Sequence, residues 1–265
     1  MSRIEKKFKE LAARGEKALI AYIMVGDPTL EVTEKLIPEL KKGGADLIEL
    51  GIPFSDPLAD GPTIQKAAVR ALNNGVSLRD AIDLVKKVRK VSQIPLIFMS
   101  YYNPIFKYGE EQFVKDAVKA GVDGVIVPDL PPEEAEGLIA HSKKNGLDTI
   151  FLLAPTSNEE RIKKVCKNST GFIYYVSMTG VTGAKFIQLE EAINIRKIRS
   201  YTKTPVAIGF GISTPGDAKE ASLFADGVIV GSAIVKVIEE NMGGKAMAKK
   251  VHDFAKGLKD GIRYA

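Results

Sequence analysis

The sequence of 265 residues contains no tryptophan and a single cysteine, Cys166. One cysteine excludes an intrachain disulfide and cannot build a zinc site alone. No hydrophobic run approaches the roughly 20 residues that a membrane-spanning helix needs. The N-terminal segment has mixed charges and no apolar core of a signal peptide. These absences predict one globular domain over residues 1–265, located in the cytoplasm and without a membrane partner.

The chain also lacks long blocks of one charge. The net charge of +5 is spread along the sequence, and lysine pairs such as Lys41-Lys42 and Lys86-Lys87 fall on helical patterns. A solvated helix face explains such pairs, so nucleic acid is not a predicted partner. No His, Cys, Asp and Glu cluster has metal-ligand spacing, so no metal is predicted.

The sequence does contain a repeated unit: a short β-branched run, a loop and an amphipathic helical pattern. Eight strands are predicted, at 19–25, 46–50, 95–99, 124–127, 148–153, 172–176, 205–208 and 227–230. Helical patterns lie between them, for example at 29–42, 78–91, 110–120, 133–144, 158–167 and 189–200. Eight such units in one chain favour a (β/α)8 barrel, also called a TIM barrel. A doubly wound open sheet is the alternative, but the GxGxxG fingerprint is missing.

Three further segments add to this barrel. Ile4, Phe8 and Leu11 have the spacing of one helix face before the first strand, which predicts an N-terminal helix capping the barrel bottom. The units after the second and sixth strands are longer than the others. We therefore expect extended loops at residues 51–62 and 177–188, on the face where barrel enzymes carry their active sites.

Glu49 stands inside the apolar run Leu-Ile-Glu-Leu-Gly, immediately before the first long loop. Alternation along a strand puts Glu49 on the same face as Leu47. A charge inside a barrel is tolerated only near its mouth, and apolar neighbours favour the protonated carboxyl group that a general acid needs. On position alone, a structural glutamate paired with a lysine remains the alternative.

Asp60 ends the same loop, in Leu-Ala-Asp-Gly-Pro before a predicted helix at Pro62-Thr63. Aspartates are common in turns and at helix N-termini, so a purely local role is the alternative to catalysis. Asp56 lies in Ser-Asp-Pro, which is typical of a turn.

Glycine-rich turns follow the last two predicted strands, at 208–213 (IGFGIS) and 230–234 (VGSAI). Glycines let backbone N–H groups approach an anion, and barrel phosphate sites commonly follow strands seven and eight. The sequence therefore predicts a phosphorylated ligand, with plain tight turns as the alternative. The glycine- and hydroxyl-rich segment 177–184 is typical of a lid that also reaches a phosphate, and we include its Thr182 among the predicted substrate contacts.

Aromatic residues gather near the predicted strand ends, among them Tyr22, Tyr101, Tyr174 and Phe210. Some of these rings belong to the core. The remainder would line a pocket for a flat apolar ring.

Taken together, these segments resemble the tryptophan synthase alpha subunit family over essentially the whole chain. The resemblance is carried, in order, by Gly26-Asp27-Pro28, GIPFSDPLADGP, YYNP, VPDLP, SMTGVTG, GFGIS and VGSA. It implies a carbon–carbon lyase of tryptophan biosynthesis that cleaves indole-3-glycerol phosphate to indole and glyceraldehyde 3-phosphate.

The resemblance also implies roles for individual residues. Glu49 falls on the family's general acid/base, Asp60 on the carboxylate that meets the indole N–H, and Tyr174 on its active-site tyrosine. The implied phosphate contacts are Gly183, Gly211, Gly231 and Ser232.

A partner follows from the same resemblance. The family's alpha subunit passes indole to a beta subunit in an α2β2 complex, and the beta subunit holds pyridoxal phosphate. No cofactor is expected in this chain. The apolar loop after Glu49 is expected to face solvent at the barrel mouth and to contact the partner through Pro53, Asp56 and Pro57.

Two other functions remain open from the sequence. One is a different phosphate-binding barrel enzyme, which would place its acid/base groups on other strands and lack the long loop after the second strand. The other is a non-catalytic activator of a second enzyme, which intact Glu49 and Asp60 argue against.

Overall fold

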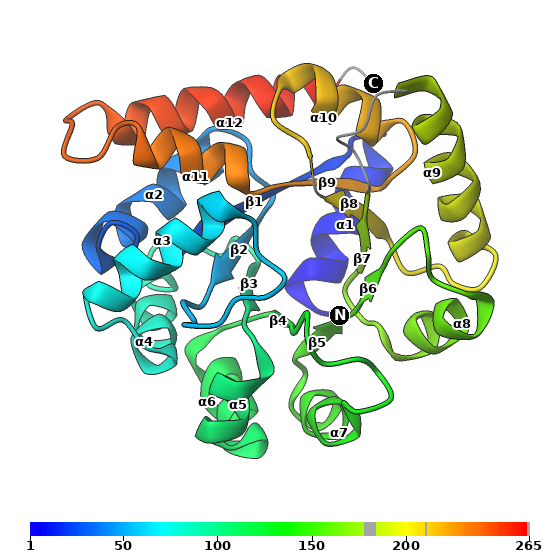
Figure 1. The fold of residues 1–265 in the computed structure, drawn as a ribbon, viewed down its shortest axis with the longest axis horizontal. Helices are drawn as coiled ribbons and strands as arrows, with labels where there is room; N and C mark the ends of the chain where they lie inside the picture. The colour runs from blue at the N-terminus through cyan, green and yellow to red at the C-terminus, as the bar shows by residue number, and fades with distance from the viewer. Residues whose placement is uncertain (178–183, 210, 264–265) are drawn as a thin grey trace.

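The computed structural model of the chain describes residues 1–177, 184–209 and 211–263, with the side chains of 184–189 outside that description. A ring of parallel strands lies inside a ring of helices (Figure 1). The sheet order is β5-β4-β3-β2-β1-β9-β8-β7-β6. The strands are β1 (Ala18–Met24), β2 (Leu47–Gly51), β3 (Leu96–Met99), β4 (Gly124–Ile126), β5 (Asp148–Ile150), β6 (Leu152–Leu153), β7 (Ile173–Val176), β8 (Val206–Gly209) and β9 (Gly227–Val230).

The two ends of this order are halves of one barrel strand. β5 pairs with β4 and β6 pairs with β7, and only Phe151 separates β5 from β6. The Phe151 carbonyl still accepts the Tyr174 N–H at 3.1 Å, so the sheet closes through this interruption. The predicted eight-stranded (β/α)8 barrel is confirmed, although the strand predicted at 148–153 is interrupted.

The outer helices are α2 (Leu30–Lys42), α3 (Pro62–Asn73), α4 (Leu78–Val88), α5 (Tyr102–Tyr108), α6 (Glu110–Ala120), α7 (Glu136–Asn145), α8 (Glu159–Asn168), α9 (Ala184–Arg199), α10 (Pro215–Ser222), α11 (Ser232–Glu239) and α12 (Met247–Arg263). None of the helices in the described ranges is long and apolar enough to cross a membrane.

Three predicted helix boundaries were wrong. α4 ends at Val88 rather than at residue 91. α7 begins at Glu136 rather than at residue 133, because the preceding prolines form a turn in which Glu134 N–H donates to the Pro131 carbonyl at 3.0 Å. α9 begins at Ala184, so the end of the loop predicted at 177–188 is helical.

The predicted capping helix is α1 (Arg3–Ala13), which begins after Ser2, whose side chain accepts the Glu5 N–H. Its buried Ile4, Phe8 and Leu11 belong to the same hydrophobic cluster as the inward side chains of the strands. The Phe8 ring lies 5.8 Å from the Phe172 ring. α1 therefore closes the end of the barrel at which the strands begin, and it appears inside the ring of helices in Figure 1.

Candidate active site

Glu49 lies in the middle of β2, opposite Tyr22 of β1 and Ile97 of β3. Its side chain faces the barrel interior, is 1% exposed, and neither carboxylate oxygen has a hydrogen-bond partner in the described structure. Burial raises the pKa of Glu49 from 4.5 to about 8. A carboxyl group in this state is protonated at neutral pH and can give up its proton to a base or a substrate.

Asp60 is held near the end of the loop between β2 and α3. Its N–H donates to the Pro57 carbonyl at 3.1 Å, and its own carbonyl accepts the Gln65 side-chain amide at 2.8 Å. Partial burial raises the pKa of Asp60 to about 6, while a hydrogen bond with Tyr101 opposes that rise. Asp60 is therefore mostly ionised at neutral pH, whereas Glu49 is mostly protonated.

Tyr101 fixes this loop from the end of β3. Its hydroxyl accepts the Ala59 N–H at 2.8 Å, and its ring stacks on Phe54 with 5.3 Å between the ring centres. Tyr101 itself is 5% exposed. Tyr101, which was predicted only to line a pocket for an apolar ring, therefore also holds Ala59, the residue before Asp60, in place.

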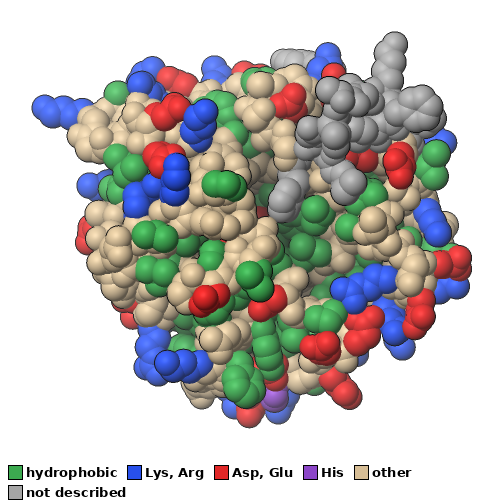
Figure 2. Space-filling view, viewed as in Figure 1, with side chains coloured by type: hydrophobic (Ala, Val, Ile, Leu, Met, Phe, Trp, Pro, Cys, Tyr) green, Lys and Arg blue, Asp and Glu red, His purple; other side chains and the backbone are tan. Residues whose placement is uncertain are grey.

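The expectation that the apolar part of this loop faces solvent was only partly right. Pro53 is buried, and Phe54 is half-buried because it packs on Tyr101. Leu58, by contrast, is 95% exposed, and Asp56 is also exposed. Figure 2 shows hydrophobic side chains gathered around a hollow near the centre of one face of the molecule.

Tyr22 and Tyr174 are buried beside two glycines at strand ends. A Cβ on Gly51 would lie 2.1 Å from the Tyr22 hydroxyl, and a Cβ on Gly209 would lie 2.5 Å from the Tyr174 hydroxyl. Both distances are far below van der Waals contact, so glycine is required for these rings to adopt their positions.

The barrel brings five of the predicted site residues together: Tyr22, Glu49, Asp60, Tyr101 and Tyr174. Burial raises the pKa of Tyr22 and of Tyr174, and the nearby Glu49 and Asp60 charges raise both further. Both phenols therefore remain neutral hydrogen-bond donors at physiological pH. Two carboxyl groups with separated pKa values among neutral phenols are typical of an acid/base site.

The predicted phosphate end lies on the neighbouring strands. β8 and β9 run parallel in register, so the segments after them emerge at the same edge of the barrel. Gly231 directly precedes α11, no side chain caps this helix, and Ser232 is its first residue. Gly211 has a φ of +73°, which favours glycine. Uncapped N–H groups at a helix N-terminus suit an anion.

Thr182, Gly183 and Phe210, the other predicted substrate contacts, lie outside the described residues. The same holds for most of the predicted lid. Their roles therefore stay predictions.

An ion-pair network that the sequence did not indicate joins α3 and α11 to Asp27, which follows β1. Arg70 of α3 donates to both oxygens of buried Asp27, at 2.7 and 2.9 Å, and to Glu239 of α11 at 2.8 Å. α3 follows the Asp60 loop, and α11 begins at the predicted phosphate site. Arg70 was missed because its partners are 43 and 169 residues away in sequence. Gly26-Asp27-Pro28 had been noted, but only as a family motif.

Within the described ranges, no group of three or more His, Cys, Asp and Glu residues is placed to hold a metal ion.

Three comparisons with known proteins are informative. The sequence profile of the tryptophan synthase alpha chain family matches residues 8–263. The tryptophan synthase alpha chain of Geotalea uraniireducens is 54% identical over 264 residues, covering 99% of this chain and 98% of that one.

Two solved structures are similar over nearly their whole length. Tryptophan synthase subunit alpha from Legionella pneumophila superposes with a TM-score of 0.92 at 40% identity, covering 99% of this chain and 98% of that one. A chain of tryptophan synthase from M. tuberculosis, in an aminoacrylate-bound form, superposes with a TM-score of 0.89 at 33% identity, covering 99% and 100%.

Proposed function

The chain belongs to the tryptophan synthase alpha chain family, and from this premise we propose that Glu49 and Asp60 carry out the family's reaction. This reaction cleaves indole-3-glycerol phosphate to indole and glyceraldehyde 3-phosphate in tryptophan synthesis, which makes the chain a carbon–carbon lyase. The observation that carries the residue assignment is the buried, unpartnered Glu49 carboxyl group beside an ionised Asp60.

In the first step, the Glu49 carboxylic acid protonates the indole carbon that bears the glycerol phosphate chain. The ring takes up positive charge, which spreads to its nitrogen. The Asp60 carboxylate accepts a hydrogen bond from that N–H and stabilises the charge as it develops. Tyr22 and Tyr174 donate hydrogen bonds or pack against the substrate without changing charge.

In the second step, the Glu49 carboxylate removes the proton from the hydroxyl on the adjacent carbon of the side chain. The electrons of that O–H bond form the aldehyde carbonyl, and the carbon–carbon bond breaks. Its electron pair returns to the ring, which leaves as neutral indole. Glu49 ends protonated, ready for the next cycle.

The phosphate group is assigned to the turns after β8 and β9, with Gly211, Gly231 and Ser232 as contacts, and the family resemblance adds Gly183 and Thr182 to these contacts. The uncapped N-terminus of α11 supports this placement. The reaction needs no cofactor from this chain, and pyridoxal phosphate belongs to the beta chain of tryptophan synthase.

We also propose that a beta subunit docks on the loop that carries Pro53, Asp56 and Pro57, in an α2β2 complex, and that the protein is cytoplasmic. Exposed Leu58 at the tip of this loop supports a docked partner, because a large apolar side chain in water gains from being covered. Docking would cover this loop and raise kcat by about an order of magnitude, as gating by loop closure allows.

The direct test is the formation of indole from indole-3-glycerol phosphate by the isolated chain and by its complex with the beta subunit. Turnover by the isolated chain would exclude a purely activating role. Asp56→Ala should reduce the stimulation by the beta subunit more than the basal rate, whereas the exposed control Asp83→Ala should change neither. Equal rates with and without the beta subunit would contradict the docking proposal but not the chemistry.

A further inference from the structure

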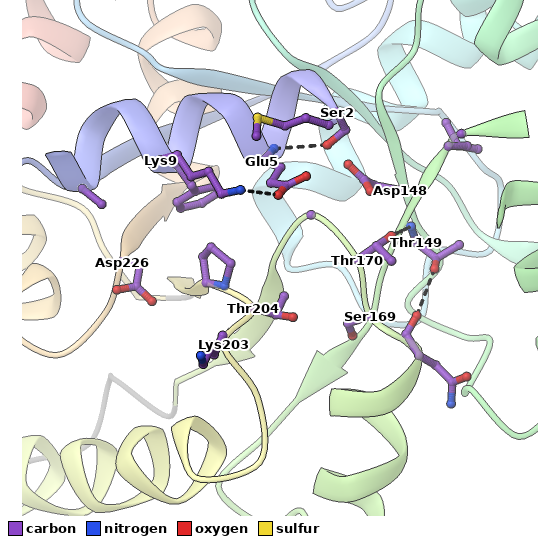
Figure 3. Close-up of a pocket in the computed structure, with 18 of the residues that line it drawn as sticks. Ser2, Glu5, Lys9, Asp148, Thr149, Ser169, Thr170, Lys203, Thr204 and Asp226 are labelled. Carbon is purple, nitrogen blue, oxygen red and sulfur yellow. Dashed lines mark hydrogen bonds and ion pairs between the residues drawn. The ribbon is translucent and has the colours of Figure 1, made fainter.

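A cleft of about 1380 Å³ lies at the opposite end of the barrel from Glu49, where the strands begin. One wall is α1, and the others are the segments that lead into β5, β7 and β8 (Figure 3). Figure 3 shows Ser2, Asp148, Ser169 and Thr204 around one space, although these residues are far apart in sequence. None of the residues assigned to indole-3-glycerol phosphate lines this cleft.

The cleft contains polar atoms that the protein leaves unsatisfied. Ser169 is 6% exposed, and its Oγ has no hydrogen-bond partner in the described structure. The Oδ2 atom of Asp148 is buried and is equally without a partner. An unsatisfied buried polar atom destabilises the folded chain. Both residues line the cleft.

Asp148 differs from the aspartates that precede other strands. Asp46 is paired with Lys259, Asp123 with Arg3 and Arg89, and Asp226 with Arg199. Asp148 has no ion pair in the described structure, and hydrogen bonds from the hydroxyl groups of Ser2 and Thr170 lower the pKa that burial raises. Asp148 is thus the member of this set that lacks a cation, and its Oδ2 atom has no partner in the described structure.

The charges around the cleft favour an anion. Its carboxylates other than Asp148 are neutralised by cations: Glu5 by Lys9, Glu16 by Lys259 and Asp226 by Arg199. Four lining lysines make no ion pair in the part of the chain that the structure describes. These lysines, called the lysine rim below, are Lys17, Lys143, Lys167 and Lys203. An ammonium group on a flexible stem suits a phosphate as a point charge.

We propose that this cleft binds a small phosphorylated polyol, with its phosphate on the lysine rim and its hydroxyl groups on Asp148 and Ser169. One hydroxyl group of the ligand donates to the Oδ2 atom of Asp148, and a second accepts a hydrogen bond from the Ser169 hydroxyl, which satisfies the two orphan atoms. Phe8 and Pro205 supply apolar walls for the carbon chain. The site is separate from the proposed catalytic site and does not depend on it.

The test uses the full chain and ribose 5-phosphate as the probe, followed by NMR of isoleucine methyl groups. Ile139 lines the cleft, whereas Ile234 lies in α11 at the proposed catalytic phosphate site. A saturable shift of the Ile139 signal supports the cleft site. Binding at the catalytic site moves the Ile234 signal instead, so the two proposals fail separately.

Three variants and two further ligands sharpen this test. Lys203→Glu should weaken the binding seen at Ile139 by about tenfold, and Ser169→Val by about threefold, since each removes one group that the ligand uses. Lys245→Glu, an exposed lysine in the loop before α12, is the matched control and should change binding by less than about twofold. Ribose and inorganic phosphate should each bind about tenfold more weakly than ribose 5-phosphate.

The proposal is overturned if the Ile139 signal shows no saturable shift, or if Lys203→Glu and Lys245→Glu bind alike. Equal affinity for inorganic phosphate and ribose 5-phosphate would also overturn it, because the hydroxyl contacts would then contribute nothing. Both cleft variants should keep the parental rate of indole formation, which shows that the barrel is intact.

Discussion

Asp46 and Glu49 are three positions apart on one strand segment, and their carboxyl groups lie in opposite surroundings. At the amino end of β2, Asp46 accepts the Leu19 N–H at 2.9 Å and the Lys259 ammonium at 2.8 Å. Further along, Glu49 is buried, and among the described residues its carboxylate oxygens have no hydrogen-bond partner. Asp46 thus helps to hold the fold together, whereas the Glu49 carboxyl group is left to exchange a proton.

The difference also has an energetic consequence. Removing one member of a buried ion pair destabilises the folded chain strongly, because the remaining charge stays buried without its partner. An unpaired buried carboxyl group destabilises the folded chain whenever it must ionise. Predictions at the two ends therefore move stability and activity in different directions.

Lys259→Met should cause the largest loss of stability, about 3–5 kcal/mol, because it leaves Asp46 as a buried charge without its cation. Lys259 is 5% exposed and also donates to the Lys17 carbonyl at 2.8 Å. Chemical denaturation measures the loss. At a temperature where the variant is folded, its kcat should be within about twofold of the parent, because kcat depends on the other end of the barrel. Lys256→Met, exposed on the same helix, is the control and should cost less than about 0.5 kcal/mol.

Glu49→Gln should reduce kcat by about a hundredfold or more, because the amide keeps the shape of the side chain but cannot carry the proton. Indole formation under saturating substrate measures the effect. A rate within about threefold of the parent would refute the assignment of Glu49.

The same variant tests the energetic side of the comparison. The pKa of Glu49 is about 8 in the folded chain and near 4.5 when exposed. The free energy of unfolding of the wild type, compared with that of Glu49→Gln, is therefore highest below pH 4.5. It falls as the pH rises from 4.5 toward 8. Between pH 4.5 and pH 8 the wild type should lose on the order of 4 kcal/mol of stability relative to the variant. A stability difference that does not change with pH would contradict the burial of an unpaired carboxyl group.

Asp60→Asn should lower kcat by about thirtyfold and leave KM nearly unchanged, because its carboxylate stabilises charge that develops only in the transition state. Steady-state kinetics with indole-3-glycerol phosphate separate the two constants. An effect confined to KM would return Asp60 to the role of a turn residue.

The pH dependence of kcat/KM is the smallest expected effect, because the activity changes little between pH 6 and pH 8. Asp60 must be ionised and Glu49 protonated, so kcat/KM should rise through about pH 6 and fall through about pH 8. Outside this window the rate should fall by about tenfold per pH unit. Asp60→Asn should remove the acid limb and keep the alkaline one. If both limbs survive in this variant, another group controls the acid side.

Several features of the site could be predicted from sequence because they depend on local signals. Three local signals locate parts of the predicted site to within a few residues. They are Glu49 in an apolar run, the proline-rich loop that ends in Asp60, and the glycines after the last two strands. The burial of Pro53 could not be predicted in this way, because it depends on how the loop folds back over the barrel mouth. Nor could the stacking of Phe54 on Tyr101, which joins segments from two different units.

By itself, the sequence determined the order of strands and the barrel, because these follow from periodicity. Its motifs also singled out Glu49 and Asp60 as candidate catalytic residues, through their resemblance to a family. Only the tertiary structure decided the state of each carboxyl group. Asp46 and Glu49 are both acids on one strand, and burial and partners from β1 and α12 leave one paired and the other orphaned. The same is true of the Arg70 network and of the cleft beneath α1, since their residues meet only when distant segments fold together. Whether a carboxyl group is paired or desolvated depends on the residues that surround it in the folded chain, and these cannot be read from the linear sequence.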